Sequence, residues 1–109
     1  SQLAGKTIGI YTLTESAGRQ AVASLKEIEP SLSIELLHDH VASPRLTRVS
    51  RDADLFVLAA ASAKHAATDC IVANRRERPL LYASGRGFSG IVRVVEEYAS
   101  RLGQHDTRH

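Results

Sequence analysis

The 109-residue sequence contains few of the residues that build disulfide scaffolds, metal clusters or aromatic cores. It has one cysteine, no methionine, no tryptophan, three tyrosines and two phenylalanines. A lone Cys70 excludes an internal disulfide and a zinc site built on several cysteines, and it fits a reducing compartment. We therefore expect a cytoplasmic protein. With so few aromatics, the core has to be aliphatic, which suits strands packed between helices.

Long apolar runs and a strong charge of one sign are also missing. The longest apolar run, residues 55–61, has seven residues, whereas a membrane-spanning helix needs about 20. No segment resembles a signal peptide, so we expect no membrane partner. The net charge is +2 and the isoelectric point is near 9.0. This is a weaker positive charge than a dedicated nucleic-acid-binding domain usually carries.

The length is sufficient for one domain with a modest core. We predict a single domain over residues 1–103, followed by a polar tail over residues 104–109. Because the sequence lacks methionine even at position 1, we expect that this domain was excised from a longer protein.

The alternation of apolar runs and helical periodicity predicts the fold class. Four runs rich in β-branched and aliphatic residues predict strands, at residues 6–13, 33–38, 53–60 and 79–83. Apolar residues at helical spacing predict helices that are capped by Ser16, opened by Pro44, capped by Ser62 and started by Ser89 or Gly90. The third is expected to run to about Arg75, and the last to end at Gly103. Strands that alternate with helices predict an α/β three-layer sandwich, Rossmann-like or flavodoxin-like, with four parallel strands in the order 2-1-3-4 and helices on both faces.

Hydroxyl, imidazole and basic side chains follow the predicted strands. In such folds, ligands bind at the carboxyl ends of the strands, and the helices that begin there present free N–H groups and a partial positive charge. Phosphate is the anion that such a site usually holds. The sequence thus predicts a binding site for a phosphorylated small molecule, most simply a nucleotide. Its candidate residues are Thr14, Ser16, Ser62, Lys64, His65, Ser84, Arg86, Gly87 and Ser89.

Simpler interpretations of these residues stay open. Gly85 and Gly90 would also be explained by a tight strand-to-helix turn that needs positive φ. The serines at positions 16, 62 and 89 would also be explained as helix caps. Arg86 lies between two glycines and is harder to explain by packing.

Metal, cofactor and catalytic motifs are weak or missing. His38 and His40 would point to opposite faces of a strand, so we expect no metal site. Neither a GxGxxG fingerprint after the first strand nor a Walker motif is present, and we expect no cofactor. No nucleophile, base and orienting group form a recognised signature. Binding is therefore favoured over catalysis.

Two other functions compete with ligand binding. An arginine-rich surface made of Arg45, Arg48, Arg51, Arg75 and Arg76 could follow the phosphate backbone of a nucleic acid, although interleaved acids also fit an ordinary solvated surface. The last predicted helix carries a wide apolar stripe around Ile91 to Val95, which would suit a homodimer.

The second half of the chain resembles a known family. The segments "DADLFVLAAASAKHAATDCI" and "PLLYASGRGFSGIVRVVEEY" are similar to the bacterial domain of unknown function 2325 over roughly residues 53–98. Matching positions are Asp54, Ser62, His65, Ser84, Gly87, Ser89 and Ile91. The resemblance implies a small Rossmann-like domain that is often fused to other modules. By architecture alone, the chain is also similar to nucleotide-sensing domains of bacterial defence proteins.

Overall fold

The protein forms a four-stranded parallel sheet with helices on both faces. The computed structural model describes residues 2–59, 65–85 and 87–106, and side chains up to residue 103. The elements run in the order β1 (Thr7–Tyr11), α1 (Glu15–Ile28), β2 (Ser33–Leu37), α2 (Pro44–Asp52), β3 (Leu55–Ala59), α3 (His65–Arg75), β4 (Leu80–Ala83) and α4 (Phe88–Asp106). The strand order is β2-β1-β3-β4, with every pair parallel. The predicted Rossmann-like architecture and strand order are confirmed.

The sheet is buried because its central strands are apolar on both faces. All five residues of β3, from Leu55 to Ala59, are buried. Successive side chains alternate between faces, so Leu55 and Val57 enter one cluster while Phe56 and Leu58 enter the other. A central strand of this kind needs a helix layer on each side.

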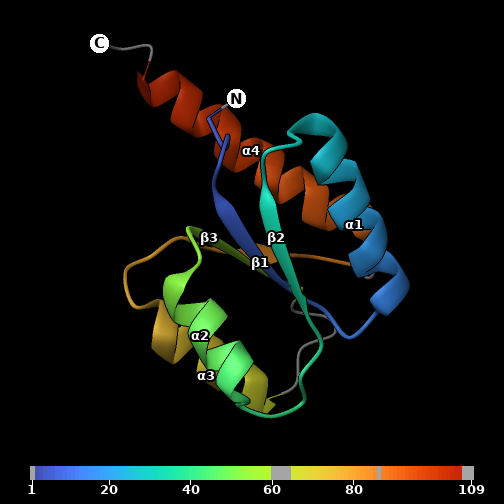
Figure 1. The fold of residues 1–109 in the computed structure, drawn as a ribbon, viewed down its shortest axis with the longest axis vertical. Helices are drawn as coiled ribbons and strands as arrows, with labels where there is room; N and C mark the ends of the chain where they lie inside the picture. Colours follow the sequence, from blue (N-terminus) through green and yellow to red (C-terminus); the bar gives the residue numbers. More distant parts are fainter. Residues whose placement is uncertain (1, 60–64, 86, 107–109) are drawn as a thin grey trace.

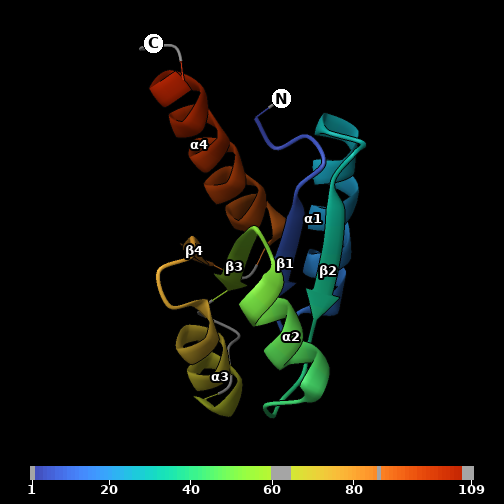
Figure 2. The same cartoon turned by 60° about the vertical axis from the view of Figure 1, so that its left-hand side comes forward.

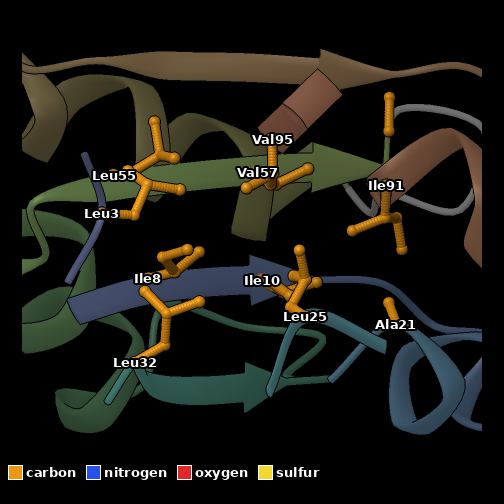
Figure 3. Close-up of a cluster of buried hydrophobic side chains, with 11 residues drawn as sticks. Leu3, Ile8, Ile10, Ala21, Leu25, Leu32, Leu55, Val57, Ile91 and Val95 are labelled. Carbon is orange, nitrogen blue, oxygen red and sulfur yellow. The ribbon is translucent and has the colours of Figure 1, made fainter. Parts of the chain in front are cut away.

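Two helix pairs provide these layers. Figure 1 shows α1 and α4 on one side of the sheet and α2 and α3 on the other. The first layer covers a cluster around Ile8, Ile10 and Val57, in which Ile91 and Val95 of α4 also take part (Figure 3). The second layer places α2 and α3 side by side (Figure 2) over the face that carries Phe56.

The apolar stripe of α4 packs into this core. Ile91 and Val95 are buried, and Val92 and Val94 pack against the same cluster. The stripe that suggested a dimer is therefore explained within one chain, and a homodimer stays a prediction. Among the described helices, none is long and apolar enough to cross a membrane.

Several helix boundaries differ from the sequence prediction. Thr14 occupies the N-cap of α1, so Ser16 lies in the first turn and the prediction that it caps this helix is wrong. α4 begins at Phe88, one residue before Ser89, and continues past Gly103 to Asp106. A single glycine lowers helix stability by only about 1 kcal/mol, which does not end a helix of this length. The capping role expected for Ser62 falls outside the described residues.

Local signals account for the short helix α2. Its N-cap Ser43 accepts a hydrogen bond from the backbone N–H of Leu46 at 3.1 Å, and Pro44 takes the first helical position. Proline is favoured there because its missing N–H would have no partner in the helix. α2 and α3 both end at the edge of the sheet where β3 and β4 begin.

Candidate functional site

The predicted ligand residues lie along the carboxyl edge of the sheet. β2 lies on one side of β1, whereas β3 and β4 lie on its other side. The direction in which successive strands are added therefore reverses between β1 and β3. Ligands of open α/β sheets bind in the crevice at this switch point. The connections that follow β1, β3 and β4 all leave the sheet at this edge, since all four strands are parallel.

The ends of β1 and β2 are fixed to each other by hydrogen bonds. Tyr11 donates its hydroxyl to the carbonyl oxygen of Asp39 at 2.7 Å. His38 Nδ1 lies 2.9 Å from the carbonyl oxygen of Thr12, and its Nε2 lies 3.7 Å from Glu15 Oε1. His38, which follows β2, therefore contacts both the residue after β1 and the first turn of α1.

The connection after β4 is a tight turn. Gly85 adopts a φ of +81°, which favours glycine because a side chain is strained there. A Cβ on Gly90 would lie 2.5 Å from the carbonyl oxygen of Ser84, so only glycine allows α4 to start this close to the strand. The structure thus supports the simpler interpretation of these two glycines, while Ser84, Gly87 and Ser89 stay exposed around the turn.

All four helices begin at this edge, and their first turns differ in charge. α1 carries Glu15 in its first turn, whereas the first turns of α2, α3 and α4 contain no acidic residue. A helix N-terminus carries about half a positive charge. Glu15 offsets this charge in α1, and at α2 the carboxylate of Asp39 accepts a hydrogen bond from the N-cap Ser43. Among the described residues, the positive ends that no such carboxylate offsets lie at β3 and β4, next to the exposed His65 and Ser89.

The structure describes part of the predicted site. It brings Thr14, Ser16, His65, Ser84, Gly87 and Ser89 to one edge. Ser62, Lys64 and Arg86 lie outside the described residues. Among the residues that the structure does describe, no group of three histidine, cysteine or carboxylate side chains is arranged to hold a metal ion.

The arginines of the alternative interpretation lie along α2 and at the end of α3, and they are not equivalent. Arg45 and Arg48 are exposed and share Glu35, with Nη2 to carboxylate oxygen distances of 2.9 and 3.6 Å. The Arg45 guanidinium, through its hydrogen bond, holds the pKa of Glu35 below its ordinary value. Arg51 pairs with Asp52 at 2.9 Å, and this hydrogen bond lowers the pKa of Asp52.

Arg75 is the largest departure from the prediction, because it is only 1% exposed. Its guanidinium donates to the carbonyl oxygens of Ser50 at 3.1 Å, Ala53 at 2.7 Å and Pro79 at 2.5 Å. It therefore joins α2, α3 and the start of β4, and cannot be a freely exposed contact for nucleic acid. Helical spacing contains the missed signal, since Arg75 is four and eight residues after the buried Ile71 and Ala67.

Comparison with known proteins identifies the family. The family model described as DpdD-like matches residues 1–94, which is most of the chain. The chain belongs to the DpdD-like family. No curated protein and no solved structure matches it. The matched DpdD-like region ends within α4 and so includes all four strands and both helix layers. Its name differs from that of the domain of unknown function 2325, and the resemblance to that family stays a prediction.

Proposed function

We propose that this DpdD-like domain binds a phosphorylated small molecule, a nucleotide in the simplest case, at the carboxyl edge of its sheet. The observation that carries the proposal is the pair of helix N-termini at β3 and β4 whose first turns contain no acidic residue. Unpaired backbone N–H groups and a partial positive charge at such termini suit a phosphate. β3 and β4 are neighbours in the sheet, so α3 and α4, which cover opposite faces, begin from adjacent positions along the same edge, where an anion between them would be close to both.

The surrounding residue types support the same ligand. Ser84 and Ser89 are exposed hydroxyls that can donate to phosphate oxygens. His65 is the first residue of α3 and is exposed as well. In sequence, Lys64 precedes this helix and Arg86 precedes the next, so both cationic residues are close along the chain to the two termini.

The family supports a cellular context for the proposal without naming a ligand. Membership in the DpdD-like family points at most to a defence locus that is associated with DNA modification. In that setting, a sensor domain for a nucleotide signal would regulate another part of a longer protein. Rossmann-like architecture alone hosts many functions, so the ligand has to be established at the site itself.

An added negative charge at α4 tests the proposal. In Ser89→Glu, the carboxylate in the first turn of the helix should leave the fold intact or stabilise it by about 0.3–1 kcal/mol. The same charge should repel a phosphate a few ångströms away and weaken binding about fivefold, since such a repulsion costs roughly 1 kcal/mol in water. Isothermal titration calorimetry with ATP and with inorganic phosphate measures this affinity.

Ser100→Glu is the matched control, because Ser100 is exposed on the same helix but lies three turns further along. The proposal predicts that the variant at position 100 binds as tightly as the unmodified protein. It is refuted if neither probe binds the unmodified protein at millimolar concentration, or if both glutamate variants bind equally well.

A further inference from the structure

A basic cleft lies at the amino edge of the sheet, opposite the site proposed above. Its volume is about 750 Å³, and it is lined by Arg51, Asn74, Arg75, Arg76, Glu77 and Arg78. These residues come from the last turns of α2 and α3 and from the connection that leads into β4. The lining carries four arginines and one glutamate and so has a formal charge of +3, which Asp52 beside Arg51 reduces to +2.

The buried Arg75 adds a positive charge and an unpartnered donor to the lining of the cleft. Burial, and then the nearby Arg78, lower the pKa of Arg75, whereas Asp54 raises it. In the described part of the structure, its Nε is buried without a hydrogen-bond partner. Arg78 uses Nη1 to donate to the carbonyl oxygens of Asp52 at 3.1 Å and Ala53 at 3.4 Å. A guanidinium has five N–H donors, so Arg78 keeps donors for an incoming anion.

Arg76 has a left-handed backbone conformation, which is normally favourable for glycine and not for arginine. It follows the last residue of α3 with a φ of +52°, the left-handed conformation that commonly ends a helix and that glycine adopts without steric cost. Its side chain is exposed and lines the cleft. An arginine at a strained position is expected where its guanidinium, and not its backbone, is the useful group.

The positive charge continues from the cleft along α2. Arg45, Arg48 and Arg51 are exposed and follow one another at intervals of three residues. They extend over about 9 Å of helix axis, at 1.5 Å per residue, which exceeds two nucleotide steps of about 3.4 Å in a duplex strand. Glu35 faces both Arg45 and Arg48, so a single carboxylate offsets two guanidinium groups.

We propose that this cleft and the arginine row of α2 bind the phosphodiester backbone of a nucleic acid. The planar guanidinium matches phosphate oxygens in bidentate geometry, and a row of them follows successive phosphates. A protein partner is disfavoured by the lining itself, because all six residues are polar and the centre of a protein interface is normally apolar and aromatic. The contacts are to the backbone, so recognition is independent of sequence.

Fluorescence anisotropy with a labelled DNA duplex of about 20 base pairs tests the proposal in Arg76→Gln. Loss of one phosphate contact should weaken binding about fivefold to tenfold near 0.1 M salt, and should lower the slope of log affinity against log salt by about 0.9. Arg19→Gln is the matched control, because Arg19 is an exposed arginine of α1, on the other face of the sheet, and should change neither value.

Arg76→Gly separates binding from folding. Glycine fits the left-handed backbone, so this variant should unfold at the same or a higher urea concentration than the unmodified protein while it loses the same affinity for DNA. Ser89→Glu, which tests the opposite edge, should bind DNA normally, so the two proposals fail or succeed independently.

Three results overturn the proposal. The first is absence of duplex binding by the unmodified protein at low salt. The second is equal affinity in the two glutamine variants. The third is displacement of the labelled duplex by polyglutamate or by ATP as readily as by unlabelled DNA, when the competitors are compared at equal concentrations of negative charge. Displacement by polyglutamate would assign the cleft to an acidic protein, and displacement by ATP would assign it to a small phosphorylated ligand.

Discussion

Replacement of the buried Arg75 by methionine isolates the energetic role of its guanidinium. Methionine has a similar length and keeps the packing of the stem, so the change removes mainly three hydrogen bonds, to the carbonyl oxygens of Ser50, Ala53 and Pro79. It also removes the charge that lies 5.9 Å from the centre of the Phe56 ring, a contact at the outer limit of a cation–π interaction.

The size of the effect follows from what is lost and what is recovered. Hydrogen bonds from a charged donor contribute about 1.5 kcal/mol each at the low end, so three contribute about 4–5 kcal/mol. Methionine relieves part of the cost of burying a cation. Two of the carbonyl oxygens keep a second donor, Arg78 Nη1 for Ala53 and the Phe56 N–H for Pro79. We expect the free energy of unfolding to fall by about 2–3 kcal/mol.

Urea unfolding, followed by circular dichroism, measures this loss. With a slope of about 1–3 kcal/mol per molar urea for a small domain, the midpoint of Arg75→Met should fall by about 1–2 M at unchanged slope. Arg93→Met, at an exposed position of α4, is the matched control and should change stability by less than about 0.5 kcal/mol. Equal midpoints for the two variants, or a higher midpoint for Arg75→Met, would show that the buried charge is not a structural anchor.

Three further substitutions test the packing and charge of the sheet. Gly9→Ala should destabilise the domain by about 1–3 kcal/mol in urea unfolding, because the new Cβ would lie 2.6 Å from the Phe56 ring. Gly90→Ala should destabilise it although alanine favours helix, since the clash is with the backbone oxygen of Ser84; stability at or above that of the unmodified protein would contradict the close approach. The pKa of Glu35 is lowered in the folded state, so its ion pair stabilises the fold above the unfolded pKa near 4.5, and this contribution disappears as the pH falls through the lower folded pKa. Glu35→Gln should therefore flatten the acid limb of stability measured from neutral pH to below pH 4, and an unchanged acid limb would show that the pair is not formed in solution.

The sequence was sufficient to predict the fold because its apolar pattern was strong. The run from Leu55 to Ala59 is buried along its whole length. An all-apolar strand, in a chain whose strands alternate with helices, indicates a parallel sheet between two helix layers. Helix ends were predicted less well, since several hydroxyl residues near a start compete as caps. At α1, Thr14 takes that position and not Ser16.

The role of Arg75 could not be predicted from charge alone. A cluster of arginines and glutamates before a proline normally indicates a solvated helix end, and Arg76 and Arg78 are indeed exposed. Arg75 differs because the ends of α2 and α3 leave backbone carbonyl groups inside the protein, and such groups need donors. One long cationic side chain can supply several, and the chain uses Arg75 for three of them.

The two proposed sites differ in how the protein itself constrains them. At the carboxyl edge, Gly85 and Gly90 are required by the turn whatever it binds, so glycine content there does not argue for a ligand, and the case depends on the uncompensated helix termini. At the amino edge the relation is reversed, because the left-handed position after α3 would be better filled by glycine and carries Arg76 instead. A residue that opposes the local preference of the fold is stronger evidence for binding than a residue that satisfies it. Arg76→Gly is therefore the most direct measure of whether this domain contacts a polyanion, since it should lower the affinity for DNA without lowering stability.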